Sequence, residues 1–210
     1  MVARYSYKKI SEHFPYKPTE EQQKAIAAIA AFAADTAPRS LLIIKGYAGT
    51  GKTSVLGAVV KALHAMERPS VLLAPTGRAA KVFAEYAERD AFTIHKKIYR
   101  QKSFSNDFGS FSLGKNLQKN TLFIVDEASM ISNESAGANA FGSGHLLDDL
   151  IEYIYEDGQG CRLILSGDSA QLPPVMLRES PALSAERLRA YGMEVREVSL
   201  TQVVRQDVDS

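Results

Sequence analysis

Two short stretches of the sequence carry residue types that can bind phosphate groups and a metal ion. The first runs from Gly46 to Thr53 and matches the pattern G-x-x-x-x-G-K-[ST] in full. Glycines in such a loop let successive backbone N–H groups point inward at phosphate oxygens, and the helix that follows adds the positive end of its dipole. Lys52 can then reach the β- and γ-phosphates, and the Thr53 hydroxyl can bind Mg²⁺. Contacts to ATP are expected from Gly46, Ala48, Gly49, Thr50, Gly51, Lys52 and Thr53.

The second stretch places two adjacent carboxylates, Asp126 and Glu127, directly after the apolar run Leu122–Val125. Two acids at the carboxyl end of a buried strand are costly unless they meet a cation or serve in proton transfer. Asp126 would hold Mg²⁺ mainly through its water shell, and Glu127 would orient or deprotonate an attacking water. The alternative is an N-terminal capping Asp followed by a first-turn Glu. The phosphate-binding pattern upstream favours the metal site.

A third polar stretch, Gly167–Pro174, follows the apolar run Arg162–Leu165. Here Gln171 stands where it could sense a γ-phosphate, and Asp168 could support the magnesium shell. The alternative for the proline pair that ends this stretch is a rigid turn.

These motifs need elements that bring them to one edge of a sheet. Apolar runs without polar alternation indicate strands buried on both faces, and they alternate with helical patterns. The first helix is expected to start at Thr19, with Gln22 completing a capping box. The alternation predicts an α/β fold with a mostly parallel sheet, helices on both faces and ligands at the carboxyl ends of the strands. Strands are expected at Leu41–Ile44, Val71–Ala74, Leu122–Val125, Arg162–Leu165 and Val195–Leu200, and helices up to about Ala34, up to about Met66, near Gly77–Arg89 and over Leu146–Glu156.

The totals limit the class of protein. A length of 210 residues fits one large domain, and 25 Lys+Arg against 24 Asp+Glu leave no global basic field, so a nucleic acid would have to be held by local groups. The single cysteine, Cys161, suits a reducing compartment and a place in the core. The chain shows no signal-peptide pattern and no apolar run of about 18–20 residues. We therefore expect a soluble, cytoplasmic protein without a membrane partner.

Three stretches depart from the alternation. The first dozen residues, Met1–Glu12, are polar and basic, which predicts a loose lead-in (residues 1–17) before a domain over residues 18–210. The stretch Tyr99–Asn120 is polar and contains several phenylalanines, and Asn133–Gly144 has the composition of a flexible loop.

With these motifs in their order, the chain resembles the RecD/Dda branch of superfamily-1 DNA helicases, from about Pro18 to Gln206. The resemblance implies a RecA-like P-loop NTPase fold, ATP and Mg²⁺ as cofactors, an adenine contact from Gln22 and a γ-phosphate contact from Arg205. It also implies catalytic roles for Lys52, Glu127 and Gln171. The motifs that carry it are Thr19–Gln22, Gly46–Thr53, Ala74–Ala80, Thr93–His95, Asp126–Met130, Gly167–Pro174 and Leu200–Gln206.

Contacts to single-stranded DNA are implied for Thr76, Arg78, Thr93 and His95. Alternatives remain open from the residues alone. Thr76 would serve equally well as a helix cap, His95 as a structural histidine, and Arg205 as an ordinary surface charge.

The family also places a duplex-splitting hairpin where this chain has residues 99–120. A hairpin around Asn106–Gly109 would present Phe104 or Phe108 for base stacking. The alternative is a loop whose phenylalanines pack onto the sheet.

The resemblance thus predicts the first motor domain of an ATP-dependent helicase, monomeric, moving 5′ to 3′ on single-stranded DNA and acting at a duplex junction. Such enzymes close ATP between two RecA-like domains, and the motifs here account for only one. We expect nucleotide binding with slow hydrolysis and no unwinding by these residues alone, because an added arginine is worth ~10³–10⁵ in rate in related sites. A stand-alone nucleotide switch or kinase-like enzyme and a nucleic-acid-binding module with a vestigial nucleotide site are the rival hypotheses.

Overall fold

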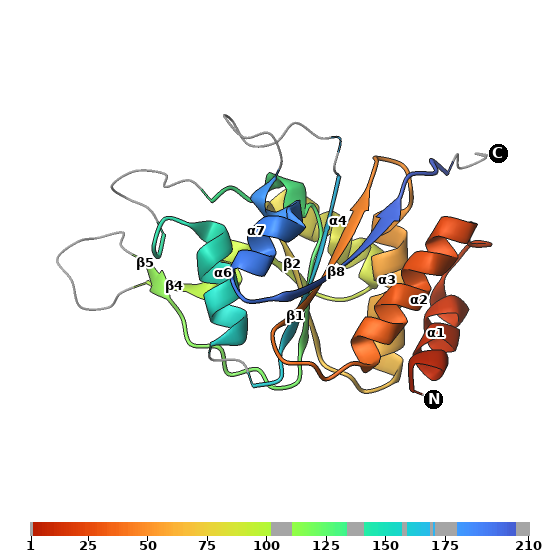
Figure 1. The fold of residues 1–210 in the computed structure, drawn as a ribbon, viewed down its shortest axis with the longest axis horizontal. Helices are drawn as coiled ribbons and strands as arrows, with labels where there is room; N and C mark the ends of the chain where they lie inside the picture. Colours follow the sequence, from red (N-terminus) through yellow and green to blue (C-terminus); the bar gives the residue numbers. More distant parts are fainter. Residues whose placement is uncertain are drawn as a thin grey trace.

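Six parallel strands form the central sheet of the computed structural model, in the order β3-β2-β6-β7-β1-β8 (Figure 1). The structure describes residues 2–101, 111–133, 141–156, 159–168, 170 and 180–204. The predicted mostly parallel α/β fold is therefore confirmed. The sheet strands are β1 (Ser40–Gly46), β2 (Ser70–Ala74), β3 (Ala91–Thr93), β6 (Leu122–Val125), β7 (Arg162–Gly167) and β8 (Glu194–Leu200).

Helices cover both faces of this sheet, and successive strand residues point to opposite faces. On β1, Leu42 and Ile44 belong to one apolar cluster, whereas Leu41 and Ile43 belong to the other. Because both faces are buried, the strands appear in the sequence as continuous apolar runs rather than alternating ones. The first face is covered by α2 (Glu20–Ala34), α3 (Lys52–Ala65) and α4 (Gly77–Ala87), with α1 (Val2–His13) packed on α2 and α3, and the second by α5 (Ile94–Ile98), α6 (Leu146–Tyr155) and α7 (Ala185–Ala190).

Helix α2 begins at the capping box predicted from the sequence. The Thr19 hydroxyl accepts the Gln22 N–H at 3.2 Å, and the Gln22 side-chain oxygen accepts the Thr19 N–H at 3.0 Å. The two residues satisfy orphan donors of the first turn reciprocally. These two bonds fix the start of α2 and hold the Gln22 side chain at that end of the helix.

The predicted loose lead-in is wrong in its local structure, because residues 2–13 form helix α1. Ile10 and Phe14 are buried against the cluster that also contains α2 and α3. Ser6 is the buried polar residue of this helix, and its stripe of few apolar residues was too sparse to indicate a helix from sequence. The prediction also missed β3, α5 and α7, which are three to six residues long.

A separate two-stranded antiparallel ribbon joins β4 (Tyr99–Gln101) to β5 (Phe111–Leu113). Tyr99 lies opposite Leu113 and Gln101 opposite Phe111. The flanks of the predicted hairpin are therefore paired, while its expected tip around Asn106–Gly109 lies outside the described residues.

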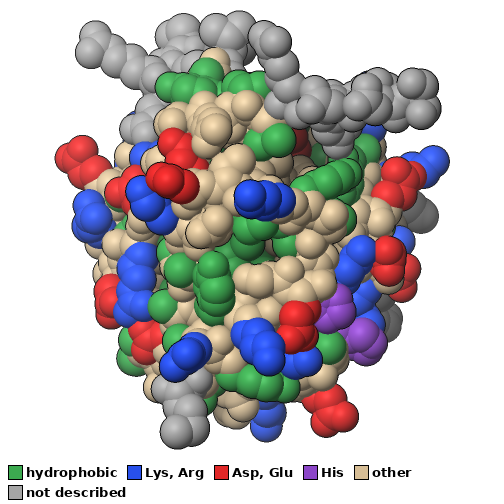
Figure 2. All heavy atoms as spheres, turned by 90° about the vertical axis from the view of Figure 1, so that its right-hand side faces the viewer, with side chains coloured by type: hydrophobic (Ala, Val, Ile, Leu, Met, Phe, Trp, Pro, Cys, Tyr) green, Lys and Arg blue, Asp and Glu red, His purple; other side chains and the backbone are tan. Residues whose placement is uncertain are grey.

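Charges of both signs are interspersed on the face that includes α1 and α2, without a large patch of one sign (Figure 2). This agrees with the near balance of 25 Lys+Arg and 24 Asp+Glu. A polyanion would not be held by this face through a general basic field. None of the helices in the described parts of the chain has the length and apolar character needed to span a bilayer.

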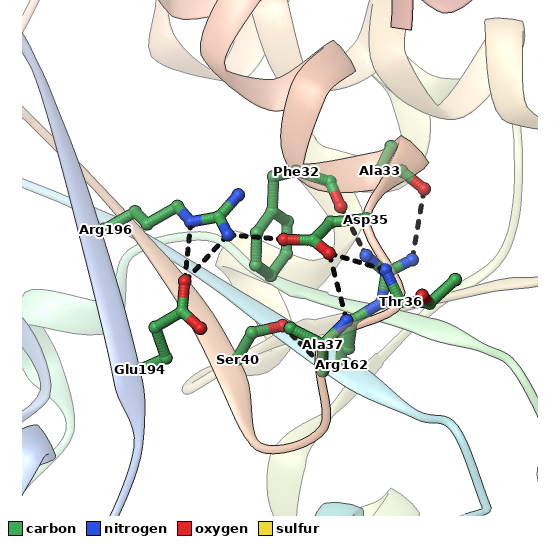
Figure 3. Close-up of polar contacts among 9 residues, drawn as sticks. All are labelled: Phe32, Ala33, Asp35, Thr36, Ala37, Ser40, Arg162, Glu194 and Arg196. Atoms are coloured by element: carbon green, nitrogen blue, oxygen red, sulfur yellow. Dashed lines mark hydrogen bonds and ion pairs between the residues drawn. The ribbon is translucent and has the colours of Figure 1, made fainter. Parts of the chain in front are cut away.

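The amino-terminal end of the sheet is tied to α2 by a buried arginine on β7. Arg162 is 8% exposed and donates to the backbone carbonyls of Phe32 and Ala33, the latter at 3.1 Å, while its guanidinium lies over the Phe32 ring at 5.2 Å (Figure 3). Burial lowers the pKa of Arg162 from its usual value. Beside it, Arg196 pairs with Asp35 and Glu194. Arg162 thus donates hydrogen bonds to two backbone carbonyls, those of Phe32 and Ala33, in the last turn of α2.

Replacing Arg162 with methionine is expected to lower the free energy of unfolding by about 2 kcal/mol, because hydrogen bonds from a charged donor to buried carbonyls are lost. Urea denaturation of both proteins measures the change. Arg189→Met, at an exposed position on α7, is the control and should change stability little. A loss below about 0.5 kcal/mol for Arg162→Met, the range of ordinary surface substitutions, would show that this contact does not stabilise the fold.

Candidate nucleotide-binding site

Three polar motifs meet at the carboxyl-terminal edge of the sheet. Strand β1 ends at Gly46, where the glycine-rich loop (Gly46–Thr53, here the phosphate loop) begins; Asp126 follows β6, and Asp168 follows β7. Strands β6, β7 and β1 are neighbours in this order. Because their carboxyl ends lie at one edge, the three motifs are brought to one place, as the sequence predicted.

The phosphate loop requires glycine at several positions. Gly49 and Gly51 have φ values of +78° and +82°, a conformation that side chains with a Cβ rarely adopt. A Cβ on Gly46 would come within 2.7 Å of the Leu200 carbonyl oxygen. Helix α3 starts directly after Gly51, so its first N–H groups face the loop.

Lys52 is buried and folds back onto the phosphate loop. Its Nζ donates to the carbonyl oxygens of Gly46 at 2.7 Å and Tyr47 at 2.8 Å. Burial lowers the pKa of Lys52, and the nearby carboxylates Asp168, Asp126 and Glu127 oppose that shift. The Lys52 ammonium group is thus buried close to three carboxylates. It can exchange its carbonyl partners for phosphate oxygens.

Thr53 and Asp126 lie in direct contact. The Thr53 hydroxyl donates to Asp126 Oδ2 at 2.8 Å, while Asp126 Oδ1 accepts from the Ser166 hydroxyl at 3.1 Å and from the Glu127 N–H at 3.0 Å. Asp126 is 3% exposed, so these donors hold its carboxylate in one orientation.

The pair of hard oxygen donors fits Mg²⁺, which binds one or two protein oxygens and completes its shell with water and substrate phosphates. Within the described residues, no cluster of three His, Cys, Asp or Glu side chains could hold a metal by itself. The metal roles of Thr53 and Asp126 stay predictions that this geometry supports.

Glu127 and Asp168 complete the acidic side of the site. Glu127 has a left-handed backbone (φ +55°), which is uncommon for a residue with a side chain and is often found at functional sites. The Asp168 carboxylate is buried and accepts the Ala170 N–H at 2.8 Å. Gln171, the predicted γ-phosphate sensor, lies outside the described residues, as do Arg205 and Phe108.

Gln22 reaches the phosphate loop from α2. Its Nε2 donates to the Thr50 carbonyl oxygen at 3.1 Å, and its Oε1 serves the capping box. Gln22 is 3% exposed, and a Cβ on Gly51 would lie 2.6 Å from its Nε2. The side chain supports the loop in this structure, and its predicted adenine contact stays a prediction.

Two of the residues predicted to contact DNA, Thr76 and Thr93, cap helices in this structure. Thr76 caps α4 by accepting the Ala79 N–H, and Thr93 caps α5 by accepting the Lys96 N–H, each at 3.2 Å. Arg78 is exposed on the first turn of α4. Thr76 follows β2 and Thr93 is the last residue of β3, so both stand at the same edge of the sheet as the phosphate loop.

His95 lies in an aromatic cluster at the base of the β4–β5 ribbon. Its ring centroid is 5.6 Å from that of Tyr99 and 5.2 Å from that of Phe141, and Phe111 lies 4.5 Å from Phe141. Burial lowers the pKa of His95, so the neutral imidazole predominates at pH 7. A DNA contact from this residue would use a neutral N–H donor.

Two buried partners were missed from sequence. Ser166, the one hydroxyl in the run Leu163–Ser166, orients Asp126. Asp149 on α6 accepts from the Tyr99 hydroxyl at 2.6 Å and from the Ser143 hydroxyl at 2.7 Å, which anchors the ribbon. A serine ending an apolar run was a usable signal, but nothing local pointed to Asp149.

The fold and the phosphate loop define a P-loop nucleotide-binding domain of the RecA-like α/β class. A family model described as an AAA domain matches residues 17–210, and the chain belongs to that family. It is 29% identical over 79% of its length to the ATP-dependent RecD2 DNA helicase of Deinococcus radiodurans, of which it covers 20%.

Other relatives point the same way. A multifunctional conjugation protein TraI of Escherichia coli is 30% identical over 74% of the chain, which covers 8% of that protein. The crystal structure of the Pif1 helicase from Candida albicans matches with a TM-score of 0.56 at 20% identity, covering 92% of this chain and 42% of that one. The chain thus spans a small part of the curated relatives it matches, and the predicted resemblance to superfamily-1 DNA helicases of the RecD branch is confirmed.

Proposed function

We propose that the chain is the ATP-binding motor domain of an ATP-dependent DNA helicase that couples ATP hydrolysis to movement on single-stranded DNA. The 2.8 Å contact between the Thr53 hydroxyl and Asp126 carries this proposal. It joins the phosphate loop to the acidic motif in the way that one shared Mg²⁺ would require. The names of the curated relatives support the helicase assignment.

In this proposal the loop N–H groups and Lys52 bind the β- and γ-phosphates, and Thr53 and Asp126 hold Mg²⁺. The metal would supply charge neutralisation between phosphate oxygens. Ser166 keeps Asp126 oriented. Glu127 positions the attacking water and accepts its proton, while Gln171 and Arg205 act at the γ-phosphate.

Single-stranded DNA would lie across the same edge of the sheet. Thr76 and Arg78 come after β2, while Thr93 ends β3 and His95 comes two residues later. A DNA strand bound by these residues would run beside the nucleotide site. Phe108, which lies between β4 and β5 in the sequence, would meet the duplex junction. We further propose a monomeric enzyme with a second RecA-like domain, 5′-to-3′ movement, cytoplasmic location and work in DNA repair or recombination.

ATP turnover with and without single-stranded DNA tests the proposal. In the full-length protein we expect DNA to raise kcat at least about tenfold, whereas the 210 residues alone should bind Mg·ATP with turnover below one per second. The second domain would supply the missing arginine, a contribution of ~10³–10⁵ in related enzymes. A full-length protein whose kcat for ATP is the same with and without DNA would instead be a nucleotide switch or a kinase-like enzyme. Turnover of several per second by the 210 residues would refute the need for a second domain.

A further inference from the structure

A single carboxylate on α2 holds the chain that follows β8. Glu21 Oε2 accepts the N–H groups of Thr201 at 2.6 Å and Gln202 at 2.8 Å, and Glu21 Oε1 accepts the Thr201 hydroxyl at 2.7 Å. These bonds lower the pKa of Glu21, the Gln202 bond most of all. We call this arrangement the Glu21 contact.

The same segment also touches the phosphate loop. The Val204 N–H donates to the Gly49 carbonyl oxygen at 2.8 Å, and the Leu200 carbonyl oxygen accepts the Tyr47 N–H at 3.2 Å. A Cβ on Gly49 would lie 3.4 Å from a methyl group of Val203. Residues 200–204 therefore run alongside the loop that would hold the phosphates.

The first turn of α2 contacts both partners of this arrangement. Gln22 donates to the Thr50 carbonyl oxygen of the phosphate loop, and its neighbour Glu21 binds residues 201 and 202. Residues 201–204 are exposed, with Val203 at 58%. In the described part of the chain, their hydrogen bonds go to Glu21 and Gly49 alone. Their position thus depends on polar contacts and not on burial.

Phosphate binding by Lys52 would free the carbonyls of Gly46 and Tyr47, because the Lys52 Nζ now donates to them. Tyr47 is also bonded to Leu200, and Gly49, two residues further along the loop, is bonded to Val204. A rearrangement of the loop will therefore be transmitted to that segment through backbone hydrogen bonds. Such a link between two sites is a coupling free energy and acts in both directions.

We propose that Glu21 is a positioning residue that couples occupancy of the phosphate loop to the chain after β8. The inference rests on the proposed nucleotide site but goes beyond it. Glu21 fixes residues 201 and 202, so movement of Gly49 is passed to Val204 through their hydrogen bond.

Amide hydrogen exchange on the 210-residue chain tests this, with Glu21→Gln compared to wild type. Glutamine keeps the size of the side chain but replaces one carboxylate oxygen by an NH₂ group. This group cannot accept hydrogen bonds from the N–H groups and hydroxyl of residues 201 and 202. We expect exchange at Thr201 and Gln202 to accelerate about tenfold, because a local opening becomes easier. Glu20→Gln is the matched control, on the same helical turn and exposed, and should exchange as wild type does. Equal rates in Glu21→Gln and wild type would overturn the Glu21 contact.

The coupling is tested by adding Mg·ATPγS to the same proteins. In wild type we expect nucleotide to slow exchange at Val204 at least threefold, and in Glu21→Gln to change it little. Thr201→Val is a milder second variant, because it removes only the hydroxyl donor. The slowing of Val204 exchange by nucleotide should be smaller in this variant than in wild type and larger than in Glu21→Gln. An equal response of Val204 in wild type and Glu21→Gln would overturn the coupling. Failure of wild type to bind the nucleotide would instead overturn the proposed function and the coupling with it, while exchange without nucleotide still decides the Glu21 contact.

Discussion

Replacing Lys52 with alanine is expected to weaken Mg·ATP binding by about 100-fold. Removing one member of a buried, hydrogen-bonded charge pair costs about 2–5 kcal/mol, and ~3 kcal/mol corresponds to roughly two orders of magnitude in Kd. The ammonium group already lies inside the phosphate loop, 2.7 Å from the Gly46 carbonyl oxygen. Titration with a fluorescent ATP analogue in the presence of Mg²⁺ measures the change.

Lys61→Ala is the matched control for this variant. Lys61 lies on the same helix α3 and pairs with the exposed Glu88, away from the phosphate loop. Its removal should leave Kd unchanged within about twofold. If Lys52→Ala bound Mg·ATP as tightly as Lys61→Ala, the loop would not be the phosphate site.

The sheet could be predicted from sequence because its strands are buried on both faces. Runs such as Leu122–Val125 have only one reasonable environment, and β6 has those bounds. The phosphate loop was also predictable, since its glycines are required by the backbone, as the φ of Gly49 and Gly51 shows. In both cases local chemistry determines local structure.

The parts of the fold and the site that could not be predicted depend on contacts between residues far apart in the chain. Helix α1 is stabilised by packing of Ile10 and Phe14 against the first face, and its own sequence is mostly polar. Glu21 and Thr201 are 180 residues apart, and Tyr99 and Asp149 are 50 apart. No pattern within a window of the sequence could have joined these partners.

The same distinction explains why the candidate DNA contacts stay predictions. Thr76 and Thr93 satisfy helix N-termini in this structure, and this role alone accounts for a threonine at each position. A DNA strand would have to add contacts to exposed groups nearby, such as Arg78. The nucleotide site differs, because Thr53 and Ser166 both already donate to the Asp126 carboxylate.

Replacing Asp126 with asparagine is expected to abolish the gain in ATP affinity that Mg²⁺ provides. The neutral amide keeps the size of the side chain but removes the charge that would attract the metal shell, and Mg²⁺ favours carboxylate oxygen. Titrating ATP with and without Mg²⁺ should show tighter binding with the metal in wild type, by about tenfold or more, and no difference in Asp126→Asn. Asp90→Asn, at an exposed position, should behave as wild type.

Asp126→Ala separates the metal role from the structural one. Alanine at this position would remove the carboxylate that accepts from Thr53, Ser166 and Glu127. Asp126 is only 3% exposed, so water cannot easily replace the carboxylate. Unsatisfied buried donors cost about 1–3 kcal/mol each, and the two hydroxyls can rotate to new partners. We therefore expect a loss of about 2–3 kcal/mol in urea denaturation for alanine and a smaller one for asparagine. An asparagine variant that still gained ATP affinity from Mg²⁺ would show that the ion is held by other groups.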